Sequence, residues 1–223
     1  MSPESVPVVQ KIMDANDQVA MINQKLLDEA GVFAINIMAS PGSGKTSTIL
    51  RTIEALAPEV RIAVIEGDTA PVTIDSDKVQ AAGIPAVQIN TGGNCHLDAP
   101  MLSRGLESFP LADIDLLIVE NVGNLICPAS FKLGTHANVV IASIPEGDDK
   151  PYKYPTIYRG LDVLIMNKID LLPYIRFNKE YFLKGVEMLN PGLTTFQVSC
   201  ETGEGIAEWA EWLKARVKEK KAK

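Results

Sequence analysis

Residues 39–46, with the sequence Ala-Ser-Pro-Gly-Ser-Gly-Lys-Thr, combine residue types that together can bind a phosphate chain. They lie between an apolar run at 33–38 and a helix-like segment at 45–57, which is the context that a phosphate-binding loop requires. N–H groups around the inner glycines would surround a phosphate at the start of the helix, where the helix dipole favours anions. Lys45 would reach the β- and γ-phosphates and act in catalysis, and the Thr46 hydroxyl would bind Mg²⁺. The residues of this loop expected to bind nucleotide are Gly42, Ser43, Gly44, Lys45, Thr46 and Ser47.

One position of this loop departs from the usual pattern. Ala39 stands where the first glycine of G-x-x-x-x-G-K-[ST] is expected. A methyl group is a small change, and the two inner glycines that line the phosphate are intact. We therefore expect nucleotide binding to be kept.

A second motif indicates which base is bound. Asn167-Lys168-Ile169-Asp170 follows the apolar run 162–166 and is typical of the guanine-binding element of GTPases. The Asp170 carboxylate would accept hydrogen bonds from guanine N1–H and the 2-amino group, two donors that adenine lacks. The Lys168 stem would cover the base, and Asn167 would tie this loop to the phosphate loop.

A later loop completes the predicted base site. Ser199-Cys200-Glu201 is similar to the Ser-Ala-Lys loop whose backbone N–H donates to guanine O6, with Cys200 in place of alanine. Each motif is weak alone, but their order after a phosphate loop makes the combination specific. The residues expected to bind guanine are Asn167, Lys168, Asp170, Ser199, Cys200 and Glu201.

Acidic residues follow two further apolar runs. The run 61–65 ends in Glu66-Gly67-Asp68, and the run 115–119 ends in Glu120. Acids at such positions beside a triphosphate serve Mg²⁺ or its bound water molecules, so we expect Asp68 and Glu120 to hold Mg²⁺ with Thr46 and to act in hydrolysis. Gly123 would leave its backbone N–H free for the γ-phosphate.

The polar stretch around Asp75 and Asp77 has two interpretations. It would form a switch loop that contacts the nucleotide through Asp75, or it would begin a helix with Asp75 or Ser76 as its N-cap. No glutamine or arginine can be assigned to position water, so we expect slow intrinsic GTP hydrolysis.

Thiols and an imidazole indicate a metal site near the same loops. Cys95 and His96 are adjacent after the run 86–89, and Cys127 follows Glu120 by a short loop. Two thiolates and an imidazole suit Zn²⁺ in tetrahedral geometry or Ni²⁺ in planar geometry. Three ligands leave one position for exchange or for a ligand from a second subunit. Without this context, a lone Cys-His pair would more often be a structural feature of a core or loop.

The elements that must position these residues alternate along the chain. Short apolar runs separated by helix-like segments argue for an α/β fold, a three-layer P-loop NTPase fold with a mostly parallel sheet of about seven strands and helices on both faces. Because the carboxyl ends of parallel strands lie at one edge, all the motifs should converge there. The expected strands are 33–38, 61–65, 86–89, 115–119, 138–142, 162–166 and 195–198, and the expected helices are 45–57, 76–82, 97–108, 178–189 and 204–218.

The two ends of the chain have their own patterns. Residues 6–29 have amphipathic helical periodicity that ends at Gly31, which predicts a helical extension over 1–30 packed on a GTPase domain over 31–223, with a partner-docking arm as the alternative. The basic C-terminal end reads as the solvated last turn of a helix.

Composition excludes several classes of protein. The net charge of −7 argues against nucleic-acid binding, and we expect no membrane association because no long apolar run occurs. Three cysteines in 223 residues do not make a disulfide framework, so we expect a cytoplasmic protein.

The sequence closely resembles the HypB family, SIMIBI-type GTPases that insert nickel during hydrogenase maturation. The matching stretches are SPGSGKT, VIEGD, NTGGNCHLDA, ENVGNLICPASF, EGDDKPYKYP, NKIDLLPY and SCETGEG, in order over residues 33–213. The resemblance implies a GTP-promoted homodimer in which Cys95, His96 and Cys127 bind Ni²⁺ or Zn²⁺ at the subunit interface, GTP/GDP and Mg²⁺ as cofactors, and a hydrogenase precursor and a companion nickel chaperone as partners. Residues 1–30 hold no Cys or His, so the N-terminal nickel store of some members is not expected.

Several alternatives remain at this stage. A sister GTPase that matures urease or a cobalamin enzyme, a nucleotide-responsive metal sensor or storage protein, and a small-molecule kinase all contain some of these features. Lys150 and Lys153 would reach the partner's nucleotide or lie in a solvated loop, and His136 is expected to be structural.

Overall fold

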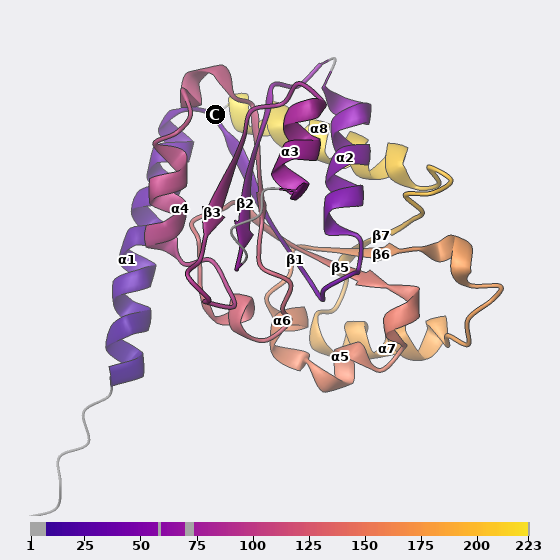
Figure 1. Cartoon of the computed structure of the whole chain (residues 1–223). Helices are drawn as coiled ribbons and strands as arrows, with labels where there is room; N and C mark the ends of the chain where they lie inside the picture. Colours follow the sequence, from indigo (N-terminus) through magenta and orange to yellow (C-terminus); the bar gives the residue numbers. More distant parts are fainter. Residues whose placement is uncertain (1–7, 58, 70–73, 223) are drawn as a thin grey trace, which may run out of the picture.

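A single parallel sheet forms the centre of the molecule (Figure 1). The structure is a computed structural model and describes residues 8–57, 59–69 and 74–222. Strand order is β3-β2-β4-β1-β5-β6-β7, and all six neighbouring pairs are parallel. The strands are β1 (Phe33–Ala39), β2 (Ile62–Asp68), β3 (Ala86–Asn90), β4 (Leu116–Glu120), β5 (Ala137–Ser143), β6 (Val163–Asn167) and β7 (Thr194–Val198).

Helices cover both faces of this sheet, which confirms the predicted three-layer fold. One face packs against α2 and α8, and the opposite face carries two apolar clusters, one under α4 and the end of α1 and one under α6 and α7. The α-helices are α1 (Val8–Glu29), α2 (Lys45–Leu56), α3 (Ile74–Ala81), α4 (Ala99–Leu106), α5 (Lys150–Lys153), α6 (Pro155–Arg159), α7 (Lys179–Leu189) and α8 (Ile206–Lys221). Short 3₁₀ turns lie at η1 (Leu111–Asp113), η2 (Cys127–Ser130), η3 (Ile144–Glu146) and η4 (Ile169–Leu171).

The seven predicted strands and five predicted helices are all present, with ends shifted by up to a few residues. Helices α5 and α6 were not expected, because each is too short to show a helical period. Helix α3 begins at Ile74, so Asp75 and Ser76 lie inside a helix. The predictions of a switch loop and of an N-cap at these two residues are therefore both wrong for their backbone.

Helix α1 lies alongside α4 (Figure 1) and is held by two buried asparagines. Asn16 Oδ1 accepts from the N–H of Ala99 at 2.9 Å, at the start of α4, and Asn23 Nδ2 donates to the carbonyls of Ala99 and Leu133 at 2.9 and 3.0 Å. These contacts confirm that this helix packs on the main domain. Among the helices that the structure describes, none is both long and apolar enough to span a bilayer.

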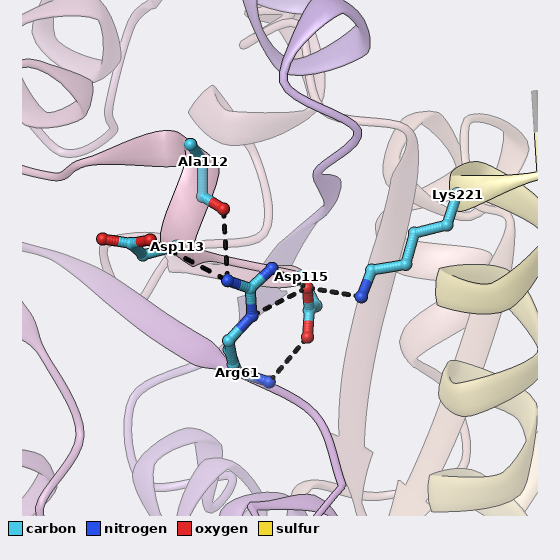
Figure 2. Close-up of polar contacts among 5 residues, drawn as sticks. All are labelled: Arg61, Ala112, Asp113, Asp115 and Lys221. Atoms are coloured by element: carbon cyan, nitrogen blue, oxygen red, sulfur yellow. Dashed lines mark hydrogen bonds and ion pairs between the residues drawn. The ribbon is translucent and has the colours of Figure 1, made fainter.

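The C-terminal lysines are not the solvated helix end that was predicted. Lys221 contacts Asp115 at 2.6 Å, and the same carboxylate accepts from the Nη2 of Arg61 at 2.6 Å (Figure 2). Lys220 pairs with Asp28 at the end of α1. Two ion pairs thus fasten the last turn of α8 to the amino-terminal edge of the sheet and to α1, contacts between segments too distant in sequence to be predicted.

His136 has a structural role, as expected. Its Nδ1 accepts from the N–H of Ala34 at 2.9 Å, its Nε2 lies 3.0 Å from Asp28, and its ring stacks on Phe33. Burial lowers the pKa of His136, and the Ala34 donor requires an unprotonated Nδ1. The ring is therefore neutral at physiological pH.

Candidate functional site

The loop between β1 and α2 has the geometry of a phosphate cradle. Gly42 and Gly44 have φ angles of 75° and 98°, in the left-handed region where glycine carries no steric cost. A Cβ added at Gly44 would collide with the side-chain amide of Asn167. Asn167 Nδ2 donates to the Ser43 carbonyl at 2.9 Å, and Lys168 Nζ donates to the Gly42 carbonyl at 2.7 Å. The predicted tie between the guanine motif and the phosphate loop is confirmed.

A cavity of about 550 Å³ lies next to this loop. It brings together residues from the phosphate-loop helix, the loop after β6 and the loop after β7, and its volume suits a nucleotide base and ribose. Predicted residues that line it are Gly44, Ser47, Asn167, Lys168, Asp170, Cys200 and Glu201. Arg51 and Glu54 of α2 also line it, and no sequence motif pointed to them.

The two guanine-motif loops are joined by hydrogen bonds. Ser199 Oγ donates to Asp170 Oδ1 at 2.6 Å and accepts from the N–H of Thr202 at 3.1 Å. Lys168 has a φ of 62°, an unusual left-handed conformation for a residue with a side chain. The hydrogen bond from Ser199 fixes the orientation of the Asp170 carboxylate.

Of the two predicted Mg²⁺ acids, Glu120 contacts the phosphate loop and Asp68 lies at the end of the neighbouring strand β2. Glu120, which is 6% exposed, lies 3.3 Å from the Thr46 hydroxyl and 4.0 Å from Lys45 Nζ. A hydroxyl and a carboxylate are the hard oxygen ligands that Mg²⁺ prefers, so these residues fit the ion. Asp68, at the end of β2, accepts from the N–H of Thr69 at 2.6 Å.

One acid at this site was not among the predicted site residues. Glu66 is 5% exposed and lies directly opposite Glu120 in the β2–β4 register, which places a second buried carboxylate beside the predicted Mg²⁺ acid Glu120. The sequence signal that could have identified Glu66 is its position directly after the apolar run 61–65, in the same Glu66-Gly67-Asp68 motif as Asp68. The side chain of Asp75 lies outside the described residues.

Cys95, His96 and Cys127 come together as predicted. Their ligand atoms all lie within 4.8 Å of one another, with the two sulfurs 2.9 Å apart and Cys95 Sγ 4.0 Å from His96 Nδ1. Cys95 and His96 lie in the loop between β3 and α4, and Cys127 begins η2 after β4. Strands β3 and β4 are separated only by β2, which explains how residues 32 positions apart meet.

Two ionisable groups of this cluster, Cys95 and His96, have shifted pKa values. The adjacent Cys127 thiol raises the pKa of Cys95, and burial lowers the pKa of His96. The His96 ring stacks on Phe131 with centroids 4.0 Å apart. A neutral imidazole held by an aromatic ring is in the form that binds a metal ion, whereas the thiols must release protons when a metal binds.

Asn121 connects the metal loop to the strand that carries Glu120. It is 0% exposed, its Oδ1 accepts from the N–H of Leu97 at 3.0 Å, and its Nδ2 donates to Asn36 Oδ1 at 3.1 Å. A Cβ added at Gly67 would collide with the Leu97 side chain. Leu97, which follows the candidate ligand His96, is therefore fixed by Asn121 and Gly67, the neighbours of Glu120 and Asp68. Spacing alone did not predict this role.

A second connection runs through Gly123. A Cβ added there would lie 3.1–3.2 Å from Pro41 of the phosphate loop. Gly123 therefore lies against the phosphate loop, four residues before the candidate ligand Cys127.

The remaining lysines of interest lie in α5. Lys153 pairs with Asp149 at 2.5 Å, and Lys150 Nζ lies 5.5 Å from the centre of the Tyr154 ring. Neither contact reaches the nucleotide cavity of its own chain.

Together, the parallel sheet, the phosphate loop and the guanine motifs define a P-loop nucleotide-binding protein of the GTPase type. The family described as "CobW/HypB/UreG, nucleotide-binding domain" matches residues 33–197. The chain belongs to this family and, within it, to the HypB hydrogenase maturation factors, as the following relatives show.

Relatives match nearly the whole chain. Hydrogenase maturation factor HypB of Rhizobium leguminosarum is 44% identical over 96% of this chain and 71% of its own length. The crystal structure of HypB from Archaeoglobus fulgidus superposes with a TM-score of 0.85 at 40% identity, covering 92% of this chain and 99% of that one. HypB from Helicobacter pylori, solved in complex with nickel, gives a TM-score of 0.88 at 33% identity, covering 92% and 96%. The predicted resemblance is confirmed.

Proposed function

We propose that this protein is a GTP-hydrolysing metallochaperone that binds nickel, or zinc, and assists nickel insertion during maturation of [NiFe]-hydrogenase. The observation that carries this proposal is the meeting of Cys95, His96 and Cys127 on loops beside the phosphate loop. A soft thiolate–imidazole set suits Ni²⁺ or Zn²⁺, and the same sheet edge carries the guanine-nucleotide residues. A nucleotide-binding sensor without turnover would share the cluster but would not hydrolyse GTP.

Hydrolysis would depend on charge and on the positions of a few side chains. Thr46, Glu120 and Asp68 would hold Mg²⁺, which would supply positive charge to the phosphates. Lys45 would offset the charge that develops there, and Glu120 would hold the Thr46 hydroxyl in place for the ion. Asp68 would orient a water molecule, and Asp75 would contact the nucleotide. A low intrinsic rate is expected, because no glutamine or arginine of the described residues can be assigned to position the attacking water.

The nucleotide would act on the metal through two contacts. Gly123 packs on Pro41, four residues before Cys127, and Asn121 binds the backbone of Leu97, one residue after His96. A shift of the Glu120–Gly123 segment on γ-phosphate loss would move ligands on both loops. Metal release would then follow hydrolysis.

Assembly would complete the metal site. Three ligands leave one coordination position open, which a second copy can fill in a GTP-promoted homodimer. Lys150 and Lys153 would reach the partner's nucleotide in that dimer.

We further propose a cytoplasmic protein with a helical extension over 1–30 and a GTPase domain over 31–223. It would act with a hydrogenase precursor and a companion nickel chaperone, without nucleic acid or membrane.

The test measures nickel affinity and stoichiometry with GDP and with a non-hydrolysable GTP analogue, alongside GTP turnover. We expect turnover that is lost in Lys45→Ala, and nickel affinities that differ between the two nucleotides. Equal affinities would exclude coupling, and absence of turnover in the unchanged protein would favour a sensor or storage role.

A further inference from the structure

An arginine at the nucleotide cavity makes a contact that the guanine motifs do not include. Arg51 lies on α2, the helix that starts at the phosphate loop, and lines the cavity together with Cys200. Its Nε donates to the Cys200 carbonyl at 2.7 Å, although the two residues are 149 positions apart. Its Nη1 donates to Glu54 Oε2 at 2.8 Å. One guanidinium therefore joins α2 to the loop after β7.

The geometry points to Arg51 as a positioning residue for guanine O6 recognition; this inference rests on the proposed guanine-nucleotide binding. The peptide between Cys200 and Glu201 is trans, so its C=O and its N–H point in opposite directions. When Arg51 holds the carbonyl on the α2 side, the Glu201 N–H faces away from α2. That orientation makes it available to the 6-oxo group of a base held by Asp170.

The rest of this loop is fixed by different partners. Ser199 is tied to Asp170, and the Cys200 thiol lies 3.4 Å from the Thr48 hydroxyl and 3.5 Å from Asn167 Oδ1. Thiol contacts are weak, whereas a hydrogen bond from a guanidinium is charge-assisted and roughly twice as strong as a neutral one. Arg51 is thus the strongest of these contacts from α2 to the loop.

The fork of the guanidinium explains why arginine suits this position. Nε and Nη1 bind the loop carbonyl and Glu54 at the same time, and Glu54 on the same helix face holds the guanidinium plane in place. A lysine ammonium reaches one of these acceptors at a time and lacks the planar fork. Selectivity for the 6-oxo group therefore depends on a residue outside the recognition loops.

The experiment compares Arg51→Gln with the unchanged protein, using four probes: GDP and IDP, which carry the 6-oxo group, and ADP and 2-aminopurine riboside diphosphate, which lack it. We expect the affinity for GDP and IDP to fall about tenfold in Arg51→Gln, and that for the other two to change less than about twofold. Arg51→Lys should recover part of the loss. Glu54→Gln is the matched control, because its amide oxygen still accepts from Nη1 and only the charge is lost, so GDP affinity should change less than about twofold.

Each outcome has a distinct meaning. A uniform loss for all four nucleotides, or no loss for GDP, would overturn the role of Arg51 in reading the 6-oxo group. If the unchanged protein does not prefer GDP to ADP, the proposed guanine-nucleotide function fails, whatever Arg51 does. Melting curves of the variants without nucleotide exclude a general loss of folding, since Arg51 is partly exposed.

Discussion

The nucleotide loops and the metal loops share one edge of the sheet but are held in different ways. Asn167, Lys168 and Ser199 join the three nucleotide loops to one another through short hydrogen bonds between loops. The metal loops are joined to each other by a hydrogen bond from Asn124 Nδ2 to the Cys95 carbonyl at 3.2 Å and by the stack of Phe131 on His96. Asn121, directly after β4, also binds the Leu97 backbone. Three side-chain hydrogen bonds of 2.6 to 2.9 Å join the nucleotide loops, and one of them fixes the base-reading Asp170. The metal loops share one longer hydrogen bond and leave the Cys95 thiol exposed.

This difference suits the two ligands. A preorganised base site gives selectivity without a cost of ordering at each binding event. A metal site whose thiol Cys95 is exposed and whose loops meet the phosphate loop at Gly123 can change when the nucleotide changes. Three predictions test this contrast, and a fourth tests stability away from both sites.

Cys95→Ala should have the largest effect. Removing one of three ligands should lower nickel affinity by at least about 1,000-fold, or about 4 kcal/mol, because two ligands cannot hold the ion against water. GDP affinity measured without nickel should be unchanged, because the contacts that hold the nucleotide loops do not include Cys95. Calorimetric titration of both ligands measures this. Cys200→Ser, which removes the thiol outside the cluster, should keep the nickel stoichiometry.

Asp170→Asn is the corresponding change at the base. GDP affinity should fall about 100-fold, because an amide presents a donor to the N1–H and 2-amino donors of guanine and leaves them unpaired. Xanthosine diphosphate, whose O2 can accept from the new amide, should bind better than GDP. Retained nickel affinity would support the view that the nucleotide loops and the metal loops are held by different contacts. A parallel fall in nickel affinity would contradict it.

Asp115→Asn tests stability away from both sites. Burial by itself would raise the pKa of Asp115, but hydrogen bonds from Arg61 and Lys221 outweigh it and hold that pKa well below its usual range (Figure 2). The substitution should lower the free energy of unfolding by about 2 kcal/mol at pH 7. Nucleotide and nickel affinities should stay the same in the folded protein.

The pH dependence of that loss has a definite sign. An aspartate in an unfolded chain has a pKa of about 3.9. Below this pH, Asp115 binds a proton in the unfolded chain but not in the folded one. The stabilisation by Asp115 is complete above that value and disappears as the pH falls toward the lower folded pKa. Urea unfolding at pH 7 and at pH 3 should show the difference between the two proteins shrinking. A constant difference would exclude the ionised carboxylate as its cause.

Gly123→Ala should have the smallest effect and the most specific one. The added Cβ would lie 3.1–3.2 Å from Pro41, so the loop must move by a few tenths of an ångström. We expect GDP and nickel each to bind within about threefold of the unchanged protein. The ratio of nickel affinities with GDP and with a GTP analogue should move toward one. An unaltered ratio would exclude Gly123 as the point of coupling.

Local pattern was sufficient for the elements and for most of the site. Short apolar runs predicted seven strands, and a run such as 138–142 could be read because strands buried on both faces are continuously apolar. The residue types that follow the strands predicted a phosphate loop, the candidate nucleotide residues Asp170 and Glu120, and three candidate metal ligands. All lie at one edge because the strands are parallel, which follows from the alternation of strands and helices along the chain.

The sequence could not predict contacts between distant segments when no motif marks the residues that make them. Arg51 on Cys200, Asn121 on Leu97 and the C-terminal lysines on Asp28 and Asp115 each depend on which elements become neighbours. The sequence by itself determined the fold class and predicted a guanine motif and three candidate metal ligands, because these depend on residue types at fixed local spacings. Only the tertiary structure decided how the loops are held, because hydrogen bonds across the sheet depend on strand order and helix packing rather than on local spacing.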